Sequence, residues 1–340
     1  MAHRVTLPPG AAEFLDRSGW RAATVSEFSA DAAFRRYFRL VDGDSSRILM
    51  FAPDPSERSE WFVALAGHMK ERGVSAPEIF AHDLDRGFIL LEDFGSRQFY
   101  QHLPELADEV PLYEAATDVL AKLHAEPMPK HIGQTKIPRF SHKRMRTQVG
   151  YFLEWHWPEV AGVPAEKALE KSFRKAWKEV LPLADYAEDR LVQYDYHSPN
   201  LMWLPDRDGI ERVGILDFQD AMRGPAAYDL VSLLQDARRD VAEGLEDAMV
   251  ARYLAQMPAF DARRFRTSYA VMGAQRATRI LGVFVRLCRR DGKPGYLHHI
   301  PRLWRQLDGN LCHPALRPVA EWFETHLPAR ERVDFGDVQS

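Results

Sequence analysis

The sequence is poor in cysteine and has no long apolar run. Its 340 residues include two cysteines, Cys288 and Cys312, which cannot form a disulfide framework and have no metal-binding spacing such as Cys-x-x-Cys. No segment approaches the roughly 18 consecutive apolar residues of a membrane-spanning helix. The N-terminus, MAHRVTLPPGAAEFL, lacks the apolar stretch and small-residue cleavage site of a signal peptide. We therefore expect reduced cysteines, no membrane partner and a cytoplasmic location.

An excess of charge of one sign is also missing, because 45 basic and 49 acidic residues leave a formal net charge of -4. Such a balance does not favour binding of nucleic acid or anionic lipid over the whole surface. No internal repeat is visible, and 46% hydrophobic and 28% charged residues are typical of a soluble globular protein. We expect a monomer that does not bind nucleic acid.

The first 95 residues predict a small antiparallel sheet that carries one helix. Apolar residues recur at helical spacing from Ser56 to Arg72, and Gly73 ends that pattern. Two short β-favouring runs precede this helix, and two more follow it as a hairpin around Asp85-Arg86-Gly87. These runs are residues 37–41, 48–51, 79–82 and 88–91.

After Gly95 the pattern is mainly helical. Helical spacing recurs in residues 111–123, 141–155, 164–180 and 228–327. Three short strands interrupt the helices between the last two of these segments, at residues 191–192, 201–204 and 213–216. The chain therefore predicts an α+β protein with a sheet-rich first part and a helical second part.

Three oxygen-bearing side chains follow short apolar runs in the stretch from Arg190 to Asp236. The spacing of Asp195 and Asn200 suits a loop that turns back on itself, and Asp217 follows the run 213–216. Phosphoryl transfer needs a group that accepts the acceptor's proton, and hard oxygen donors for Mg²⁺ on a nucleotide. Asp195 is the candidate base, and Asn200 and Asp217 are the candidate metal ligands. Turn and cap residues are the alternative for each one alone.

The grouping of these residues resembles a known family. The motifs Asp195-x-x-x-x-Asn200, Leu216-Asp217-Phe218 and Gly224-Pro225-x-x-Tyr228-Asp229-Leu230 resemble those of the aminoglycoside phosphotransferase and choline kinase family over residues 25–242. A closer resemblance is to bacterial kinases that phosphorylate the anomeric hydroxyl of N-acetylmuramate and N-acetylglucosamine in cell-wall recycling. It is carried by residues 200–204, 217–221, 274–276, 280–284 and 289–294.

The resemblance implies a protein-kinase-like fold of two lobes, with ATP and Mg²⁺ as cofactors. Residues 1–95 would form the N-lobe, which binds nucleotide, and residues 96–340 the C-lobe, which holds the catalytic loop, the metal site and the sugar-binding helices. The segment Leu91, Glu92, Asp93 and Phe94 resembles the hinge whose backbone holds adenine. Asp229 resembles the acid that braces the catalytic loop. The implied reaction is phosphorylation of the anomeric hydroxyl of an amino sugar.

The sequence departs from the family pattern at three places. Gln193 replaces the histidine that usually begins the catalytic loop, and residues 29–34, SADAAF, lack the glycines of a phosphate-binding loop. Met50 stands where the family has a phosphate-binding lysine. Another cation must replace it, and the candidates are Arg35, Arg36, Arg39 and Arg47, of which we assign Arg35 and Arg39 to the nucleotide. A solvated sheet face is the alternative.

For the acceptor sugar we select His197, Arg223 and Arg276. His197 lies inside the catalytic loop, Arg223 follows the metal-site loop, and Arg276 lies on a helix rich in arginine. An arginine is the usual partner of a carboxylate such as the lactyl group of N-acetylmuramate. A loop-structuring histidine and a solvated helix are the alternatives.

Two other functions fit the same residues. One is a kinase of an amino alcohol or an aminoglycoside, and the other is a nucleotide-binding pseudokinase that acts as a scaffold. The intact set Asp195, Asn200 and Asp217 argues against the pseudokinase. Which sugar and anomer are preferred, and whether ATP or GTP is used, do not follow from the sequence.

Overall fold

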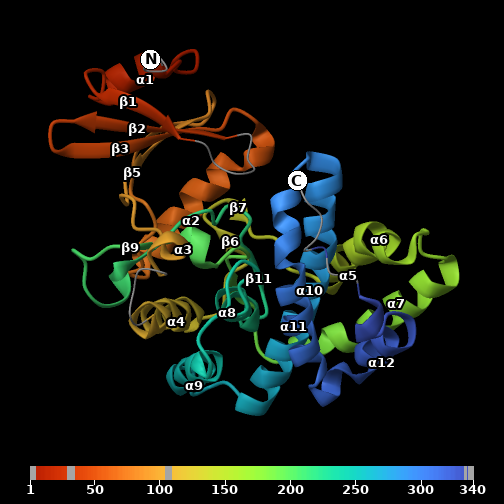
Figure 1. Cartoon of the computed structure of the whole chain (residues 1–340). Helices are drawn as coiled ribbons and strands as arrows, with labels where there is room; N and C mark the ends of the chain where they lie inside the picture. Colours follow the sequence, from red (N-terminus) through yellow and green to blue (C-terminus); the bar gives the residue numbers. More distant parts are fainter. Residues whose placement is uncertain (1–4, 29–34, 104–108, 333–334, 336–340) are drawn as a thin grey trace. The chain divides into compact units, whose positions relative to one another are not determined.

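The structure is a computed structural model that describes residues 5–28, 35–103, 109–332 and 335 (Figure 1). The chain divides into two compact units, which we describe separately. The first unit comprises Met1–Val119, Lys130–Ile137 and Ser198–Asp220, and the second comprises Leu120–Pro129, Pro138–His197 and Ala221–Ser340. Among the described residues, no helix has the length and apolarity needed to cross a membrane.

The first unit contains an antiparallel sheet of five strands in the order β1-β2-β3-β5-β4. Its strands are β1 (Thr24–Phe28), β2 (Arg36–Asp42), β3 (Ser45–Phe51), β4 (Ile79–Asp83) and β5 (Phe88–Glu92). The four strands predicted from the sequence are confirmed. The edge strand β1 was missed because nearly all of its side chains are exposed, so it has no alternating apolar pattern.

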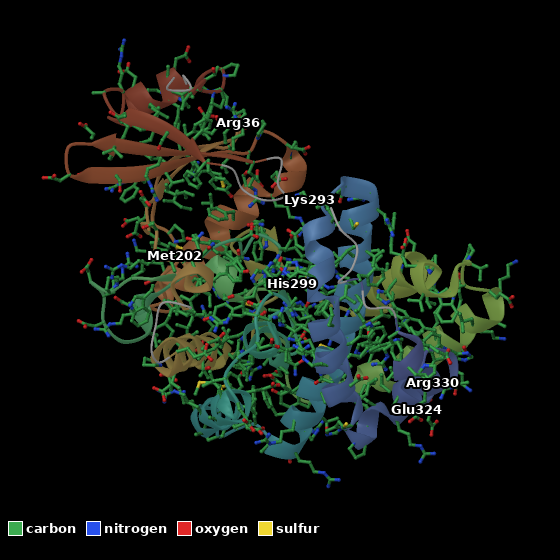
Figure 2. The ribbon with its side chains drawn as sticks, in the orientation of Figure 1. Arg36, Met202, Lys293, His299, Glu324 and Arg330 are labelled. Carbon is green, nitrogen blue, oxygen red and sulfur yellow. The ribbon has the colours of Figure 1, made fainter. Side chains whose placement is uncertain are left out.

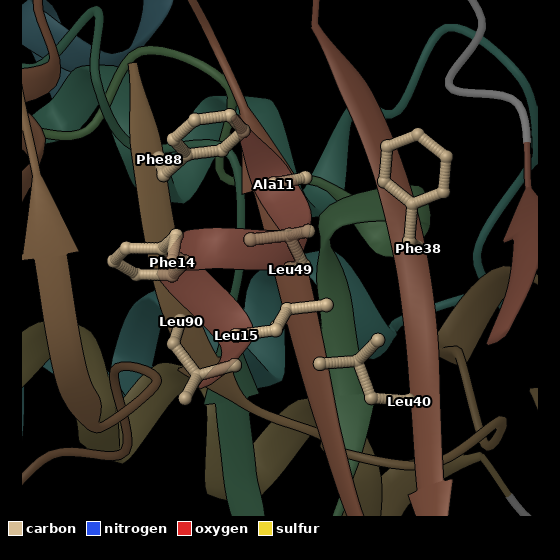
Figure 3. Packing of buried hydrophobic residues seen from close by; sticks show 8 residues of the cluster. All are labelled: Ala11, Phe14, Leu15, Phe38, Leu40, Leu49, Phe88 and Leu90. Atoms are coloured by element: carbon tan, nitrogen blue, oxygen red, sulfur yellow. The ribbon is translucent and has the colours of Figure 1, made fainter. Parts of the chain in front are cut away.

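One face of this sheet packs against helix α1 (Ala11–Arg17), as Figure 3 shows. Phe38 and Leu40 of β2 are fully buried on this face. The period of two along a strand places Tyr37 and Arg39 on the opposite face, as predicted. The remaining members of the cluster are Ala11, Phe14, Leu15, Leu49, Phe88 and Leu90.

The rest of the first unit adds short helices and two hairpins. Helix α2 begins at Ser59, later than the predicted Ser56, because Pro55–Glu57 forms a 3-10 turn, and it ends at Glu71, next to the predicted Arg72. Strands β9 (Leu201–Trp203) and β10 (Val213–Ile215) pair as a hairpin. The other elements are α3 (Phe99–His102), β6 (His131–Ile132) and β7 (Thr135–Lys136). Helix α4 (Val110–His124) runs from the first unit into the second.

The second unit is mainly helical, as predicted. Its helices are α5 (His142–Tyr151), α6 (Trp157–Ala161), α7 (Lys167–Val180), α8 (Ala227–Leu234), α9 (Leu245–Gln256), α10 (Ala262–Asp291), α11 (Ile300–Leu311) and α12 (Arg317–His326). One strand pair, β8 (Arg190–Val192) with β11 (Met222–Gly224), leads into the loop that carries Asp195. Strand β11 was missed because its sequence, Met222-Arg223-Gly224, has a single apolar side chain and a glycine in place of a β-favouring run.

Helix α10 is the longest element of the second unit, and it approaches the backbone of another helix at Gly282. A π-helical turn, Phe152–His156, follows α5. A side-chain carbon at Gly282 would overlap the Tyr151 carbonyl and would lie 2.6 Å from the Phe152 nitrogen. Only glycine therefore permits this approach of the two helices.

We expect Gly282→Ala to lower the free energy of unfolding by about 1–3 kcal/mol, because the backbone it meets cannot turn aside. Gly309→Ala in α11 is the matched control, since a side-chain carbon there meets nothing within 4 Å. The control should stabilise the protein by about 0.5–1 kcal/mol, the usual gain of alanine over glycine in a helix. Urea unfolding of both variants measures the difference, and equal effects would contradict the packing argument.

Candidate active site

The first unit brings the two predicted metal ligands together. Asn200 lies just before β9 and Asp217 lies just after β10, and Leu201 pairs with Ile215 across these antiparallel strands. The Leu216 N–H donates to the Asn200 carbonyl at 2.9 Å. The Asn200 Nδ2 lies 3.5 Å from the Asp217 Oδ2. The hairpin thus presents a carboxylate and an amide from the same edge.

Asp217 has the backbone and the surroundings of a functional carboxylate. Its φ of 56° lies in the left-handed region, which a residue other than glycine adopts at a cost. Gln219 Nε2 donates to the Asp217 Oδ1 at 2.6 Å, yet 46% of the Asp217 side chain is exposed. The next residue, Phe218, stacks on Phe62 of α2 with ring centroids 4.7 Å apart, which holds the loop in place.

The donor set at this edge fits Mg²⁺ bound together with a nucleotide. Among the described residues, no group of three or more His, Cys, Asp or Glu side chains is placed to hold a metal alone. Mg²⁺ typically takes one or two protein oxygens and fills its other positions with water and phosphate oxygens. The half-exposed carboxylate of Asp217 beside the amide of Asn200 matches that requirement.

Arg35 is the one of the four candidate arginines that lies beside this edge. Its side chain is almost fully buried, forms an ion pair with Glu57, and places Nη1 3.7 Å from the Asp217 Oδ1. Although burial opposes the charged form, Tyr37 and the two carboxylates raise the pKa of Arg35 above its usual value. The guanidinium therefore stays charged next to the predicted metal ligand.

Arg35 also lies on the sheet face where the family lysine would project. Tyr37 pairs with Met50 across β2 and β3, so the two side chains project to the same face. Arg35 stands two residues before Tyr37 and hydrogen-bonds to it. Met50 itself is buried. A cation thus reaches this region from Arg35, the residue just before β2, although β3 carries none at Met50.

The other three arginines have partners elsewhere in the first unit. Arg36, labelled in Figure 2, pairs with Glu27 at 2.7 Å. Arg47 stacks on the Phe80 ring at 3.9 Å. Arg39 pairs with Asp93 at 2.7 Å and donates to the Gly95 carbonyl at 2.9 Å. The glycine-poor segment 29–34 lies outside the described residues.

The predicted hinge lies at the end of β5. Leu91 is the cross-strand partner of Ile48 and is buried. The carboxylate of Glu92 pairs with Arg207, while that of Asp93 accepts the Gly95 N–H at 2.9 Å. Phe94 packs against Met202 and Leu204 of the β9–β10 hairpin. Both acidic side chains are therefore engaged with protein groups, and the Glu92 N–H donates to the Glu78 carbonyl at 2.8 Å.

In the second unit, the loop that carries Asp195 is braced from α8, as the resemblance implied. Asp229 lies on α8 and accepts hydrogen bonds from the Gln193 N–H at 2.6 Å and the Tyr194 N–H at 3.0 Å. Both donors are main-chain N–H groups, so this bracing does not depend on the side chain at position 193, where glutamine replaces the family's histidine. Burial raises the pKa of Asp229 to about 7, and the two hydrogen bonds oppose that shift.

Tyr194, the residue before Asp195, fixes the direction of the loop. Its φ of 79° is left-handed, and its ring stacks on Tyr228 with centroids 5.6 Å apart. Its hydroxyl accepts a hydrogen bond from Gln148 Nε2 at 2.6 Å and another from Arg279. Strain of this kind persists only where the surroundings enforce it. The position of Asp195 therefore depends on residues from α5, α8 and α10.

The three predicted acceptor residues lie in the second unit together with Asp195. His197 is buried, and burial lowers its pKa to about 3, so that the imidazole is neutral at pH 7. Arg276 is buried and donates from Nη1 to the Gln235 carbonyl at 2.9 Å. Arg223 forms an ion pair with Asp189 at 2.7 Å, so its guanidinium is engaged in a contact with protein.

Sequence reasoning missed several contributors to this arrangement. Glu57, which pairs with Arg35, is an ordinary acid in a turn, and no local pattern marks it. Arg238 and Arg279 act electrostatically on His197 together with Arg276. Arg279 lies three residues after Arg276 on one helix, and this spacing indicates that the two side chains share a face.

Comparison with known proteins identifies relatives over most of the chain. The sequence profile described as the phosphotransferase enzyme family matches residues 24–266. An N-acetylmuramate/N-acetylglucosamine kinase of Caulobacter vibrioides is 36% identical over 352 aligned positions, which cover 94% of this chain and 97% of that protein. A protein of the same name from Pseudomonas aeruginosa is 34% identical and covers 91% of each chain.

Solved structures are similar in fold at low sequence identity. The ADP-bound aminoglycoside phosphotransferase APH(2'')-Ib superposes with a TM-score of 0.60 at 13% identity, covering 89% of this chain and 99% of that one. Choline kinase LicA from Streptococcus pneumoniae gives 0.59 at 13% identity, covering 89% and 98%. The predicted fold class, protein-kinase-like with an antiparallel sheet and a mainly helical part, is confirmed.

Proposed function

The chain belongs to the phosphotransferase enzyme family, and from this membership we propose that it transfers the γ-phosphoryl group of ATP to the anomeric hydroxyl of N-acetylmuramate or N-acetylglucosamine. The observation that carries the proposal is the set of relatives with that substrate pair in their name. Four such proteins are 32 to 36% identical over 82 to 94% of this chain. The reaction belongs to cell-wall recycling, and we place a monomeric enzyme in the cytoplasm.

Asp195 is the proposed base. The anomeric oxygen forms a bond to the γ-phosphorus, the bond from that phosphorus to the bridging oxygen breaks, and ADP leaves. Asp195 takes the proton that the hydroxyl releases. An anomeric hydroxyl is more acidic than an ordinary sugar alcohol, which lessens the demand on the base. The contacts of Asp229 and Tyr194 support this role, because they hold the loop before Asp195 in one conformation.

Asn200 and Asp217 are the proposed Mg²⁺ ligands. The bound ion would neutralise phosphate charge and orient the γ-phosphoryl group. Arg35 is the proposed replacement for the family lysine, and its place beside Asp217 supports this. We favour Arg35 over Arg39, which is held by Asp93.

The nucleotide would bind to the lobe formed by residues 1–95, with the catalytic and sugar-binding residues in 96–340. The main chain of Leu91, Glu92, Asp93 and Phe94 would hold the adenine ring. This is supported by the engagement of the Glu92 and Asp93 carboxylates with protein groups.

On the acceptor side we propose that His197 and Arg276 contact the sugar. A neutral, buried imidazole beside a buried guanidinium supports hydrogen bonding to hydroxyl or carboxylate oxygens. Arg223 is the weaker candidate because Asp189 already neutralises it.

The alternative of a cationic acceptor, an amino alcohol or an aminoglycoside, is disfavoured by the charges near His197. A cationic acceptor calls for a surplus of acidic side chains, whereas one carboxylate, that of Asp236, and three guanidinium groups act on this histidine. The pseudokinase alternative is disfavoured by the pairing of Asn200 with Asp217 and by the cation beside them.

Purified enzyme with MgATP should release ADP in the presence of N-acetylmuramate or N-acetylglucosamine, and not with choline or aminoglycosides. A coupled ADP-release assay over this panel measures the result, and the same assay with GTP reports the nucleotide preference. Turnover of choline or an aminoglycoside alone would identify the related kinase. ATP binding without turnover of any acceptor would favour the scaffold.

A further inference from the structure

Three arginine side chains of the second unit act electrostatically on His197, as does the carboxylate of Asp236. They are Arg238, which follows α8, and Arg276 and Arg279, which lie on α10. The charges of all three act on His197. None of them forms an ion pair with a carboxylate in the part of the chain that the structure describes.

Many other arginines of the same unit lie within ion-pair distance of acids, mostly on the surface, whereas the buried Arg190 donates to the main-chain carbonyls of His124 and Glu188. The pairs are Arg139 with Asp185 and Asp189, Arg223 with Asp189, Arg289 with Glu159, Arg290 with Asp291, and Arg302 with Asp240. Arg276 therefore combines more burial with less compensation than these paired arginines, while Arg238 and Arg279 are half-buried.

The contacts of the two helix arginines leave donors unused. Arg276 gives one hydrogen bond, from Nη1 to the Gln235 carbonyl, and Arg279 gives one, to the Tyr194 hydroxyl. The Nε of each is buried and has no acceptor among the described residues. Burial lowers the pKa of Arg276, as expected for a cation removed from water. A buried guanidinium with neutral partners costs free energy unless an anion joins it.

The charges near the cluster leave room for one acid. The carboxylates of Asp195 and Asp236 both act on Arg276, while His197 is neutral. Arg276 also acts on a third carboxyl, that of Asp229, whose pKa burial raises to about 7. Three guanidinium groups therefore face two carboxylates and one carboxyl group that is protonated in part at neutral pH, which leaves positive charge in excess, and one of the two carboxylates is the proposed base. An acceptor that carries its own carboxylate would balance this excess.

We infer that Arg238, Arg276 and Arg279 form a carboxylate site that selects acid-bearing acceptors, and so prefers N-acetylmuramate to N-acetylglucosamine. The inference rests on the proposed function. The two sugars differ in the lactyl ether, whose acid lies two ring carbons from the anomeric carbon. An anomeric hydroxyl at Asp195 would bring that acid toward arginines whose charges already interact with Asp195. Guanidinium groups suit this role because they bind carboxylates through two parallel hydrogen bonds.

Three acceptors test the inference: N-acetylmuramate, its primary amide, and N-acetylglucosamine. The amide keeps the shape of the lactyl group and removes its charge. The wild-type enzyme should show a kcat/KM for the acid on the order of 10- to 100-fold above that for the amide, as expected for hydrogen bonds to a charged group. The ratio of the two values is the readout, because it is independent of effects common to all acceptors.

Arg276→Gln and Arg238→Gln should each bring the acid-to-amide ratio close to one, while Arg276→Lys should keep part of it. Arg290→Gln is the matched control, since Arg290 lies on the same helix, is exposed, and pairs with its neighbour Asp291. Its ratio should equal that of the wild type. If the glutamine variants lowered kcat/KM for all three acceptors by the same factor, the arginines would be structural and the inference would be wrong.

Titration calorimetry of the same sugars with the wild-type enzyme separates this inference from the proposed function. Tighter binding of the acid than of the amide, with no phosphorylation of either sugar, would overturn the proposed reaction and leave the carboxylate site standing. Phosphorylation of all three acceptors with equal kcat/KM would leave the reaction standing and overturn the carboxylate site.

Discussion

Asp195→Ala is expected to lower kcat for the amino sugar by about 10²- to 10⁴-fold, the usual contribution of a positioned general base. The variant loses the carboxylate that we propose as the acceptor of the sugar's proton, while Asn200 and Asp217 remain. We expect a loss toward the lower end of this range, because an anomeric hydroxyl releases its proton more readily than other sugar hydroxyls. ADP release at saturating sugar and nucleotide measures kcat.

Asp195→Asn is the companion variant, since it keeps the size and most hydrogen bonds of the side chain and removes the basic oxygen. It should lose nearly as much kcat as the alanine variant. Nucleotide affinity should stay close to that of the wild type in both, because the proposed nucleotide contacts belong to other residues. Near-normal kcat in either variant would contradict the role of Asp195 as the base.

Much of the fold is visible in the sequence because its elements carry strong local patterns. The strands at 37–41 and 88–91 alternate or are wholly apolar, and α7 repeats its apolar residues every three or four positions. Strand β1 gives no such signal. It is held at the sheet edge by its pairing with β2 and buries little of its own surface, so only the tertiary structure reveals it.

In the candidate site, too, residues marked by a local pattern could be predicted, and residues placed by tertiary contacts could not. Asp195, Asn200 and Asp217 lie within a short stretch between apolar runs, where local spacing indicates their roles. The choice among the arginines does not follow from spacing, because it depends on partners distant in sequence. Arg35 meets Asp217, 182 positions along the chain (217 - 35 = 182), whereas Arg39 meets Asp93. Packing therefore decides which of the two arginines lies near Asp217.

Arg35→Ala is expected to lower kcat/KM for ATP by about 10²- to 10³-fold, the range seen when one preorganised charge-stabilising donor is removed. The guanidinium is held by Glu57 beside Asp217, so it meets developing phosphate charge without having to reorganise. Arg35→Lys should retain part of the rate because it keeps a positive charge with fewer donors. Steady-state kinetics with varied MgATP at saturating sugar measure the effect.

Arg39→Ala is the matched control, because Arg39 lies on β2, four residues after Arg35. Its guanidinium binds Asp93 and the Gly95 carbonyl, and we expect a change of a few-fold at most, mainly in KM. A larger loss with Arg39→Ala than with Arg35→Ala would reverse the assignment of the phosphate cation.

Burial makes a second control necessary for Arg35. Removing it alone leaves the carboxylate of Glu57, 11% exposed, without its partner, and an unpaired buried charge destabilises a fold. The double variant Arg35→Ala with Glu57→Ala removes both charges and should recover thermal stability relative to Arg35→Ala. Stability that returns while kcat/KM stays low would separate a role at the phosphates from a role in folding. Recovery of both would show that the arginine serves only to neutralise Glu57.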